Sequence, residues 1–106
     1  GMLERTMIVI TSEFGRTSKV KGNGGRDHHP NGFSCALAGG GIKGGQAIGA
    51  TNEKGREPDP KFEPKDLHAT IATAMGMNVE KRFHPKGGGR PSFVGGRGKP
   101  IMDLLA

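Results

Sequence analysis

A short apolar run near the start of the chain constrains the fold more than any other feature. Residues 7–11 read Met-Ile-Val-Ile-Thr, a continuous stretch that is rich in β-branched side chains. Such a run is typical of a strand buried on both faces, as in a parallel sheet covered by helices. Because ligands of open α/β sheets bind beyond the carboxyl ends of such strands, a functional site is expected in the polar residues that follow Thr11.

The composition limits how much core this strand can join. Only 32% of the 106 residues are apolar, and 20 are glycine, far above the usual share of about 7%. We therefore predict a single partial α/β domain over residues 1–106, with few strands, one main helix and long glycine-rich loops. An interior strand needs neighbours that so short a chain hardly supplies, so we interpret the chain as the C-terminal segment of a larger domain. Gly1 before Met2 is typical of a remnant of an expression tag.

The order of the other elements follows from apolar spacing and from glycine and proline. Apolar residues at helical spacing predict a helix from Asp66, as N-cap, to Met75, with Gly76 as the stop. Strands are predicted over residues 6–11, 33–38 and 46–51, a polar loop over 12–32, an extended connection over 56–65, and a last helical turn over 101–105. Cys35 falls inside the second strand, and we expect it to be a small core residue.

Glu13 is the sharpest single candidate for a functional residue. It lies just beyond the first predicted strand, in the segment Ser-Glu-Phe-Gly-Arg-Thr. A carboxylate in that place suits a hard metal ion or the role of a general base. The alternative is an ion pair with Arg16 that ties down the loop.

A second candidate is the triplet Asp27-His28-His29, which offers one carboxylate and two imidazoles. All three side chains are competent ligands for zinc or a similar ion. Since adjacent residues of an extended loop point in opposite directions, we do not expect His28 and His29 to bind the same ion. The alternative is a solvated, histidine-rich turn.

Arg16 and Arg26 flank these acidic and imidazole groups. Guanidinium groups suit the oxygens of phosphate and sulfate, so both arginines are candidates for contacting an anionic substrate. Alternatively, they neutralise Glu13 and Asp27. The glycine run at residues 39–45 has a GxGxxG spacing, but no helix is predicted after it, so we expect a turn with close backbone packing rather than a dinucleotide site.

The net charge of +6 favours anionic partners. We do not expect nucleic acid, because the basic residues do not form one dense block and no aromatic residues are interleaved with them. No apolar stretch approaches the roughly 20 residues of a membrane span. The composition leaves a second function open: a non-catalytic, basic, glycine-rich module that binds acidic partners or self-associates through exposed sheet edges.

The motifs, taken in order, resemble the C-terminal portion of the domain-of-unknown-function 1501 family. The residues that carry the resemblance are Ser-Glu-Phe-Gly-Arg-Thr after the first strand, Gly-Arg-Asp-His-His-Pro, Gly-Gly-Gly-Ile-Lys-Gly-Gly, Gly-Ala-Thr and Asp-Leu-His-Ala-Thr-Ile. They extend from about residue 6 to residue 105. That family groups with the alkaline phosphatase and sulfatase superfamily.

The resemblance implies an alkaline-phosphatase-like α/β sandwich that hydrolyses anionic phosphate or sulfate esters with the help of a divalent metal. Zinc is the first expectation for that metal, with manganese or calcium as alternatives. By the same resemblance, Glu13 and His28 are the best metal-ligand candidates, followed by Asp27 and His29. The segment that carries the superfamily's nucleophile has no counterpart in this sequence, so the chain alone is expected to be inactive as a hydrolase.

Overall fold

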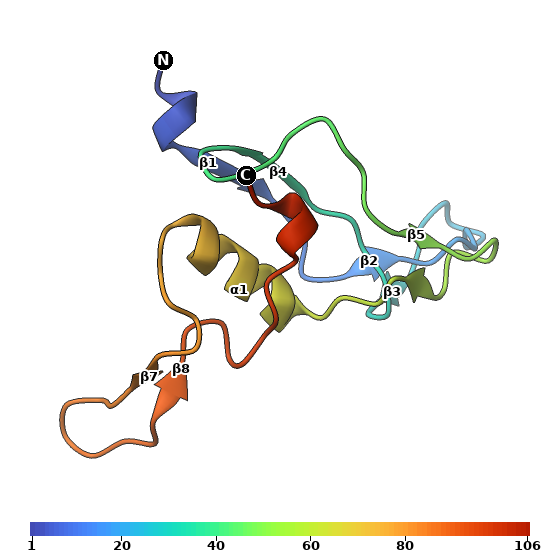
Figure 1. Cartoon of the computed structure of the whole chain (residues 1–106). Coiled ribbons are helices and arrows are strands. Elements are labelled where there is room, and N and C mark those ends of the chain that lie inside the picture. Colours follow the sequence, from blue (N-terminus) through green and yellow to red (C-terminus); the bar gives the residue numbers. More distant parts are fainter. The chain divides into compact units, whose positions relative to one another are not determined.

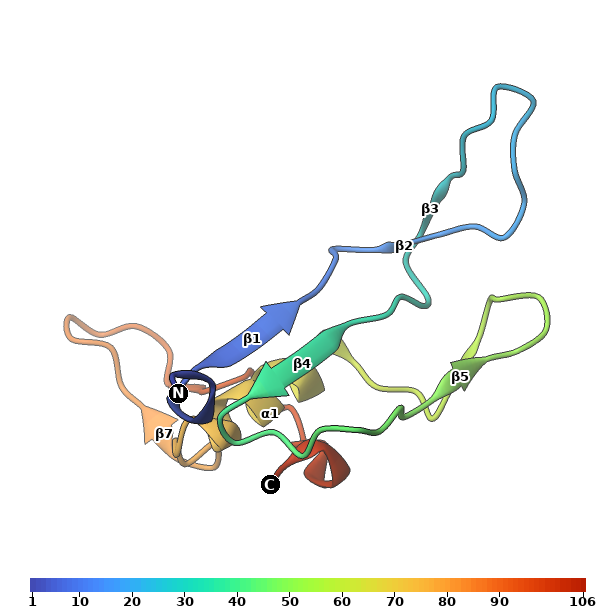
Figure 2. The same ribbon diagram turned by 90° about the horizontal axis from the view of Figure 1, so that it is seen from above.

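The protein is a small mixed α/β structure with one α-helix and strands that pair two by two. A computed structural model describes residues 1–106 (Figures 1 and 2). The chain divides into two compact units, which we call the helical unit (residues 1–7, 38–44 and 62–106) and the hairpin unit (residues 8–37 and 45–61). The prediction of one main helix is confirmed, whereas the structure has eight short strands in four pairs rather than few strands.

The first predicted strand exists, but it is not buried on both faces. Strand β1 (Met7–Ile10) pairs only with β4 (Ala36–Gly39), and the two arrows run in opposite directions in Figure 2. Along β1 half-buried and exposed residues alternate, so Ile8 is 48% and Ile10 67% exposed. The prediction of an interior parallel strand is therefore wrong, because nothing in the chain covers its second face. Cys35 is also exposed rather than part of a core.

Two short antiparallel pairs build the hairpin unit. Strand β2 (Gly15–Arg16) pairs with β3 (His28–His29), and β5 (Ala50–Thr51) pairs with β6 (Pro58–Asp59). The first pair lies inside the stretch predicted as a polar loop, and the second reduces the strand predicted over residues 46–51 to its last two residues. Ladders of two residues are too short to leave a periodic apolar pattern, which explains why the sequence does not reveal them.

The helix α1 (Pro64–Ala74) is the only element with buried residues, namely Ala69, Thr70 and Ala72. Its N-cap is Glu63 rather than Asp66, so the predicted start was three residues late. Asp66 lies in the first turn instead, where its carboxylate accepts the backbone N–H of Glu63 at 2.9 Å. Gly76 follows the helix with φ +81°, as the predicted stop requires.

The last residues of the chain pack on α1. The Thr70 hydroxyl accepts the backbone N–H of Ile101 at 2.8 Å, just before the 3-10 helix η2 (Met102–Leu104), so the predicted last turn is confirmed. In the connection between α1 and η2, strand β7 (Arg82–Phe83) pairs with β8 (Ser92–Phe93) (Figure 1). A second 3-10 helix, η1 (Leu3–Arg5), precedes β1.

The glycine run after β4 forms a tight turn, as predicted. Gly41 has φ +79°, and a Cβ there would lie 2.8 Å from the carbonyl oxygen of Ala74. Its own carbonyl accepts the backbone N–H of Ala106 at 3.1 Å. No helix follows the run, so the GxGxxG spacing reflects close backbone packing. No helix in the structure is long and apolar enough to cross a lipid bilayer.

Candidate functional site

All six candidate side chains lie on or beside one hairpin, residues 13–29, which we call the arginine–histidine hairpin. The pairing of β2 with β3 places Arg16 opposite His28 and Gly15 opposite His29. The other three candidates, Glu13, Arg26 and Asp27, lie within two residues of these strands. Gly15 makes the pairing possible, because a Cβ at this position would overlap the carbonyl oxygen of Gly32. A hairpin thus brings together Arg16 and His28, which lie 12 positions apart in the sequence.

An aromatic stack orders the exposed face of this hairpin. The rings of Phe14 and His28 stack with centroids 3.8 Å apart and an interplanar angle of 24°. The guanidinium carbon of Arg16 lies 5.2 Å from the Phe14 centroid. Sequence reasoning did not single out Phe14, although it lies between two of the candidates. The stack holds the imidazole of His28 at the surface, where the ring remains exposed.

The two arginines bind the backbone of the hairpin rather than carboxylates. Arg16 donates from Nη1 to the carbonyl oxygen of Arg26 at 3.0 Å. Arg26 donates from Nη1 to the carbonyl oxygens of Thr17 at 2.8 Å and Ser18 at 2.6 Å. The alternative in which these arginines neutralise Glu13 and Asp27 is therefore wrong. Since a guanidinium carries five N–H donors, each arginine keeps donors for a further anion.

Two of the four predicted metal ligands already have partners within the chain. The carboxylate of Asp27 forms an ion pair with Lys21, with Nζ and Oδ1 2.5 Å apart. The Nε2 atom of His29 lies 3.3 Å from the carbonyl oxygen of Arg56. Glu13 is exposed, and its carboxylate forms neither a hydrogen bond nor an ion pair within the chain. Glu13 and His28 are thus the two predicted metal ligands whose side chains form no hydrogen bond or ion pair.

The side chains of this protein do not build a complete metal centre on their own. The structure contains no group of three or more His, Cys, Asp or Glu side chains arranged to hold an ion. Structural zinc sites use four protein ligands and catalytic sites three. The hairpin therefore offers at most a partial ligand set.

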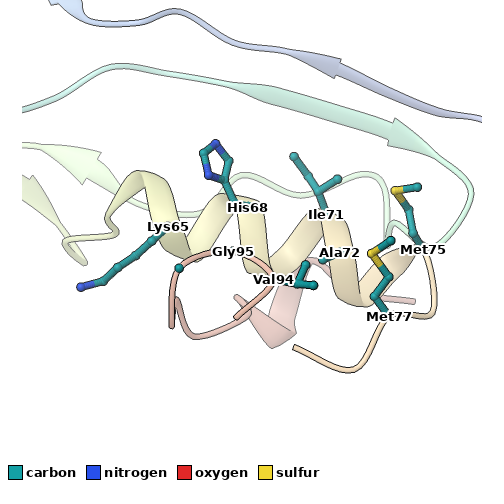
Figure 3. A pocket seen from close by; sticks show the side chains of 9 residues that line it. Lys65, His68, Ile71, Ala72, Met75, Met77, Val94 and Gly95 are labelled. Atoms are coloured by element: carbon teal, nitrogen blue, oxygen red, sulfur yellow. The ribbon is translucent and has the colours of Figure 1, made fainter. Parts of the chain in front are cut away.

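A groove lies beside α1, and none of the six candidate residues lines it. It is an open groove of about 660 Å³ lined by Lys65, His68, Ile71, Ala72, Met75, Met77, Val94, Gly95 and Gly96 (Figure 3). Its lining is mostly apolar, and the ammonium group of Lys65 is paired with Glu63, which raises the pKa of the lysine. His68 is the one other polar side chain of the lining, so the groove offers few polar groups to position a substrate.

The fold and the hairpin define a small mixed α/β protein with a basic, histidine-bearing hairpin. The chain belongs to the DUF1501 family, described as proteins of unknown function, which it matches over residues 1–105. No curated protein and no solved structure matches the chain.

Proposed function

We propose that this chain is the C-terminal part of a metal-dependent hydrolase domain of the alkaline phosphatase and sulfatase type, acting on anionic phosphate or sulfate esters. The arginine–histidine hairpin is its contribution to the site. The observation that carries the proposal is that one hairpin gathers an unpaired carboxylate, an exposed imidazole and two arginines with free donors. In this role Arg16 and Arg26 contact the anionic group of the substrate.

Glu13 and His28 are the two metal ligands in this proposal. They are the predicted ligands whose side chains form no hydrogen bond or ion pair inside the chain, and zinc is the first choice for a carboxylate–imidazole pair, before manganese or calcium. The remaining ligands come from outside the 106 residues, since no third side chain joins these two.

The small core supports the view that further polypeptide completes the domain. Only Ala69, Thr70 and Ala72 are buried, whereas many large apolar side chains are exposed. The most exposed of these are Met2 at 76%, Ile10 at 67%, and Met75 and Met102 at 66% each. A domain of this length ordinarily buries about two thirds of its unfolded surface, so a covering segment would supply what the chain lacks.

Calorimetric titration with zinc and with manganese tests the hairpin as a metal site. We expect weak zinc binding by the wild-type chain that is lost in both Glu13→Ala and His28→Ala. The matched controls are Glu53→Ala and His84→Ala, which remove an exposed carboxylate and an exposed imidazole elsewhere and should leave binding unchanged. Binding that is indifferent to Glu13 and His28, or that is equally lost in the controls, contradicts the assignment.

The same preparation should not hydrolyse p-nitrophenyl phosphate or p-nitrophenyl sulfate, with or without metal. The expected reason is that the nucleophile and the other ligands are missing from these residues. Turnover that follows the protein through purification and disappears in His28→Ala would show that the chain is a complete enzyme, against the proposal.

A non-catalytic self-assembly module is the second candidate function, and the open edges of the β1–β4 pair favour it. Each of these strands has one hydrogen-bonded neighbour only, so its other edge is unpaired. Unpaired edges that carry apolar residues promote association between chains. Multi-angle light scattering over a concentration series tests this candidate: a monomer at every concentration argues against self-assembly, and a defined oligomer supports it.

A further inference from the structure

The positive charge of the protein is concentrated in one segment. Residues 81–97, which we call the basic hairpin, contain five Lys and Arg and no Asp or Glu, whereas the rest of the chain contains eleven Lys and Arg against ten Asp and Glu. Five of the six net positive charges therefore belong to 17 consecutive residues. These cations are Lys81, Arg82, Lys86, Arg90 and Arg97.

The pairing of β7 with β8 brings these cations together with two aromatic rings. Arg82 lies opposite Phe93, and Phe83 lies opposite Ser92. The guanidinium carbons of Arg82 and Arg97 lie 5.8 Å and 4.9 Å from the Phe93 centroid, and Lys81 Nζ lies 5.7 Å from the centroid of Phe83. Phe83 follows Lys81 and Arg82 directly in the sequence, and the pairing adds Phe93 from ten positions away. The hairpin thus interleaves aromatic and basic residues, which the sequence analysis did not expect.

None of these charges is neutralised within the chain. The ion pairs Lys21–Asp27 and Lys65–Glu63 lie outside the basic hairpin, and none of the five cations of the hairpin forms an ion pair. A cation over an aromatic face keeps its charge and its outward N–H donors. The hairpin thus presents a field of fixed positive charge that attracts polyanions.

The glycine tip of the basic hairpin and the exposed ring of Phe83 indicate what kind of polyanion can bind. Gly87 and Gly88 have φ +96° and +91°, and a Cβ at either residue would meet nothing within 4 Å, so the backbone of the tip is open to a ligand. Lys86 and Arg90 flank this tip. The ring of Phe83 is 45% exposed, which leaves part of its surface free for stacking.

We propose that the basic hairpin binds single-stranded nucleic acid without sequence preference, with its cations on the phosphates and Phe83 stacked on a base. Proteins with this activity combine a positive track for the backbone with aromatic side chains for the bases. In a duplex the bases are stacked inside and cannot reach Phe83, and an acidic peptide carries no bases that could stack on the ring. A single strand offers both phosphates and accessible bases. This inference is independent of the hydrolase proposal, because the two hairpins share no residue.

Fluorescence anisotropy with a labelled oligo-deoxythymidine tests the electrostatic part. We expect binding that weakens steeply with salt, and Lys86→Gln should lower the affinity about fivefold at roughly 0.1 M salt, since each phosphate contact on a single strand adds about 0.7 to the slope of log K against log[salt]. The matched control is Lys61→Gln, an exposed lysine of the hairpin unit. An equal loss in both variants, or no binding by the wild type, overturns the proposal.

Substitutions of Phe83 test the stacking part. Phe83→Leu keeps the charge and the apolar character and should lower the affinity about fivefold or more, whereas Phe83→Tyr keeps the ring and should retain binding. Circular dichroism checks that both variants fold like the wild type. If Phe83→Leu binds as well as the wild type, or if polyglutamate competes as effectively as unlabelled oligo-deoxythymidine at equal charge, the hairpin is a general polyanion site and the assignment to nucleic acid is wrong.

Discussion

At the scale of single residues, Asp66 and Thr70 join α1 to the segment that leads to the C-terminus. The Asp66 carboxylate accepts the backbone N–H of Glu63 at 2.9 Å and that of Lys99 at 2.8 Å. One turn later, the buried Thr70 hydroxyl donates to the Asp66 carbonyl at 2.6 Å and accepts from Ile101. These two side chains therefore cap the first turn of α1 and also bind the segment from Lys99 to Ile101 to the helix.

The stability of the protein should depend on pH through Asp66. Hydrogen bonds from the backbone N–H groups of Glu63 and Lys99 lower the pKa of Asp66 in the folded state. Because the pKa of Asp66 is lower in the folded state, this stabilisation is fully present at pH values above the unfolded-state pKa of about 3.9. It is lost as the pH falls through the folded-state pKa. Asp66→Asn should lower the free energy of unfolding by about 1 kcal/mol at pH 7, because it replaces two hydrogen bonds to a charged carboxylate by weaker bonds to a neutral amide. Urea denaturation measures the difference.

The pH dependence itself provides the check on Asp66. The gap between Asp66→Asn and wild type should narrow as the pH falls below about 4. Glu53→Gln is the control, because Glu53 is exposed in a turn. A gap that persists unchanged in acid would show that the charge of Asp66 contributes nothing to stability.

Thr70→Val should lower the free energy of unfolding more than Thr73→Val does, although both replace a hydroxyl by a methyl group on the same helix. The Thr70 hydroxyl serves two partners, whereas that of Thr73 donates only to the Ala69 carbonyl, at 2.8 Å. Removing Thr70 leaves the Ile101 N–H without its partner, a loss of about 1–3 kcal/mol. Equal free energies of unfolding for the two variants would contradict the bridging role.

At the scale of elements, the arginine–histidine hairpin depends on one close approach of backbones. Gly15→Ala would force its Cβ into the Gly32 carbonyl oxygen. We expect β2 and β3 to separate, which would remove the stack of Phe14 on His28. The imidazole protons of His28 should then lose their upfield ring-current shift in the proton NMR spectrum.

Gly22→Ala is the control for the hairpin, because a Cβ at residue 22 meets nothing within 4 Å. This variant should keep the shifted His28 signals. If Gly15→Ala keeps them too, the contact with Gly32 does not hold the hairpin together. A loss in both variants would point to a general sensitivity of this loop to substitution.

The same element shows how far the sequence predicted the candidate site. The motif order placed Glu13, Arg16, Arg26, Asp27 and His28 near one another, and the hairpin does bring this region together. The partners were not predictable, because Arg16 and Arg26 bind carbonyl oxygens that every residue type carries. Whether the gathered residues bind metal or substrate stays a proposal.

At the scale of the whole molecule, the scarcity of buried apolar surface should dominate the thermodynamics of unfolding. With Ala69, Thr70 and Ala72 as the only buried residues, unfolding exposes little new apolar area. We expect a heat-capacity change well below the ordinary value of about 1.2–1.5 kcal/mol/K for a 100-residue domain. Differential scanning calorimetry of the isolated chain measures it, and a full-sized value would show that the chain buries far more surface in solution.

Features that depend on a few neighbouring residues were predictable from the sequence. Helical spacing from Leu67 to Ile71 and the left-handed residue Gly76 specify α1 and its end, and Gly41 specifies a tight turn. Backbone preferences of this kind act locally, so they can be read along the chain.

Contacts between residues far apart in the sequence became visible only in the folded structure. The two-residue ladders of the hairpins, the place of Asp66 between Glu63 and Lys99, and the contact of Gly15 with Gly32 carry no periodic signal. Each depends on backbone groups that all residues share, and on close approaches that arise once the chain is folded. The exposure of β1 has the same origin, since burial depends on what covers a strand and not on the strand's own residues.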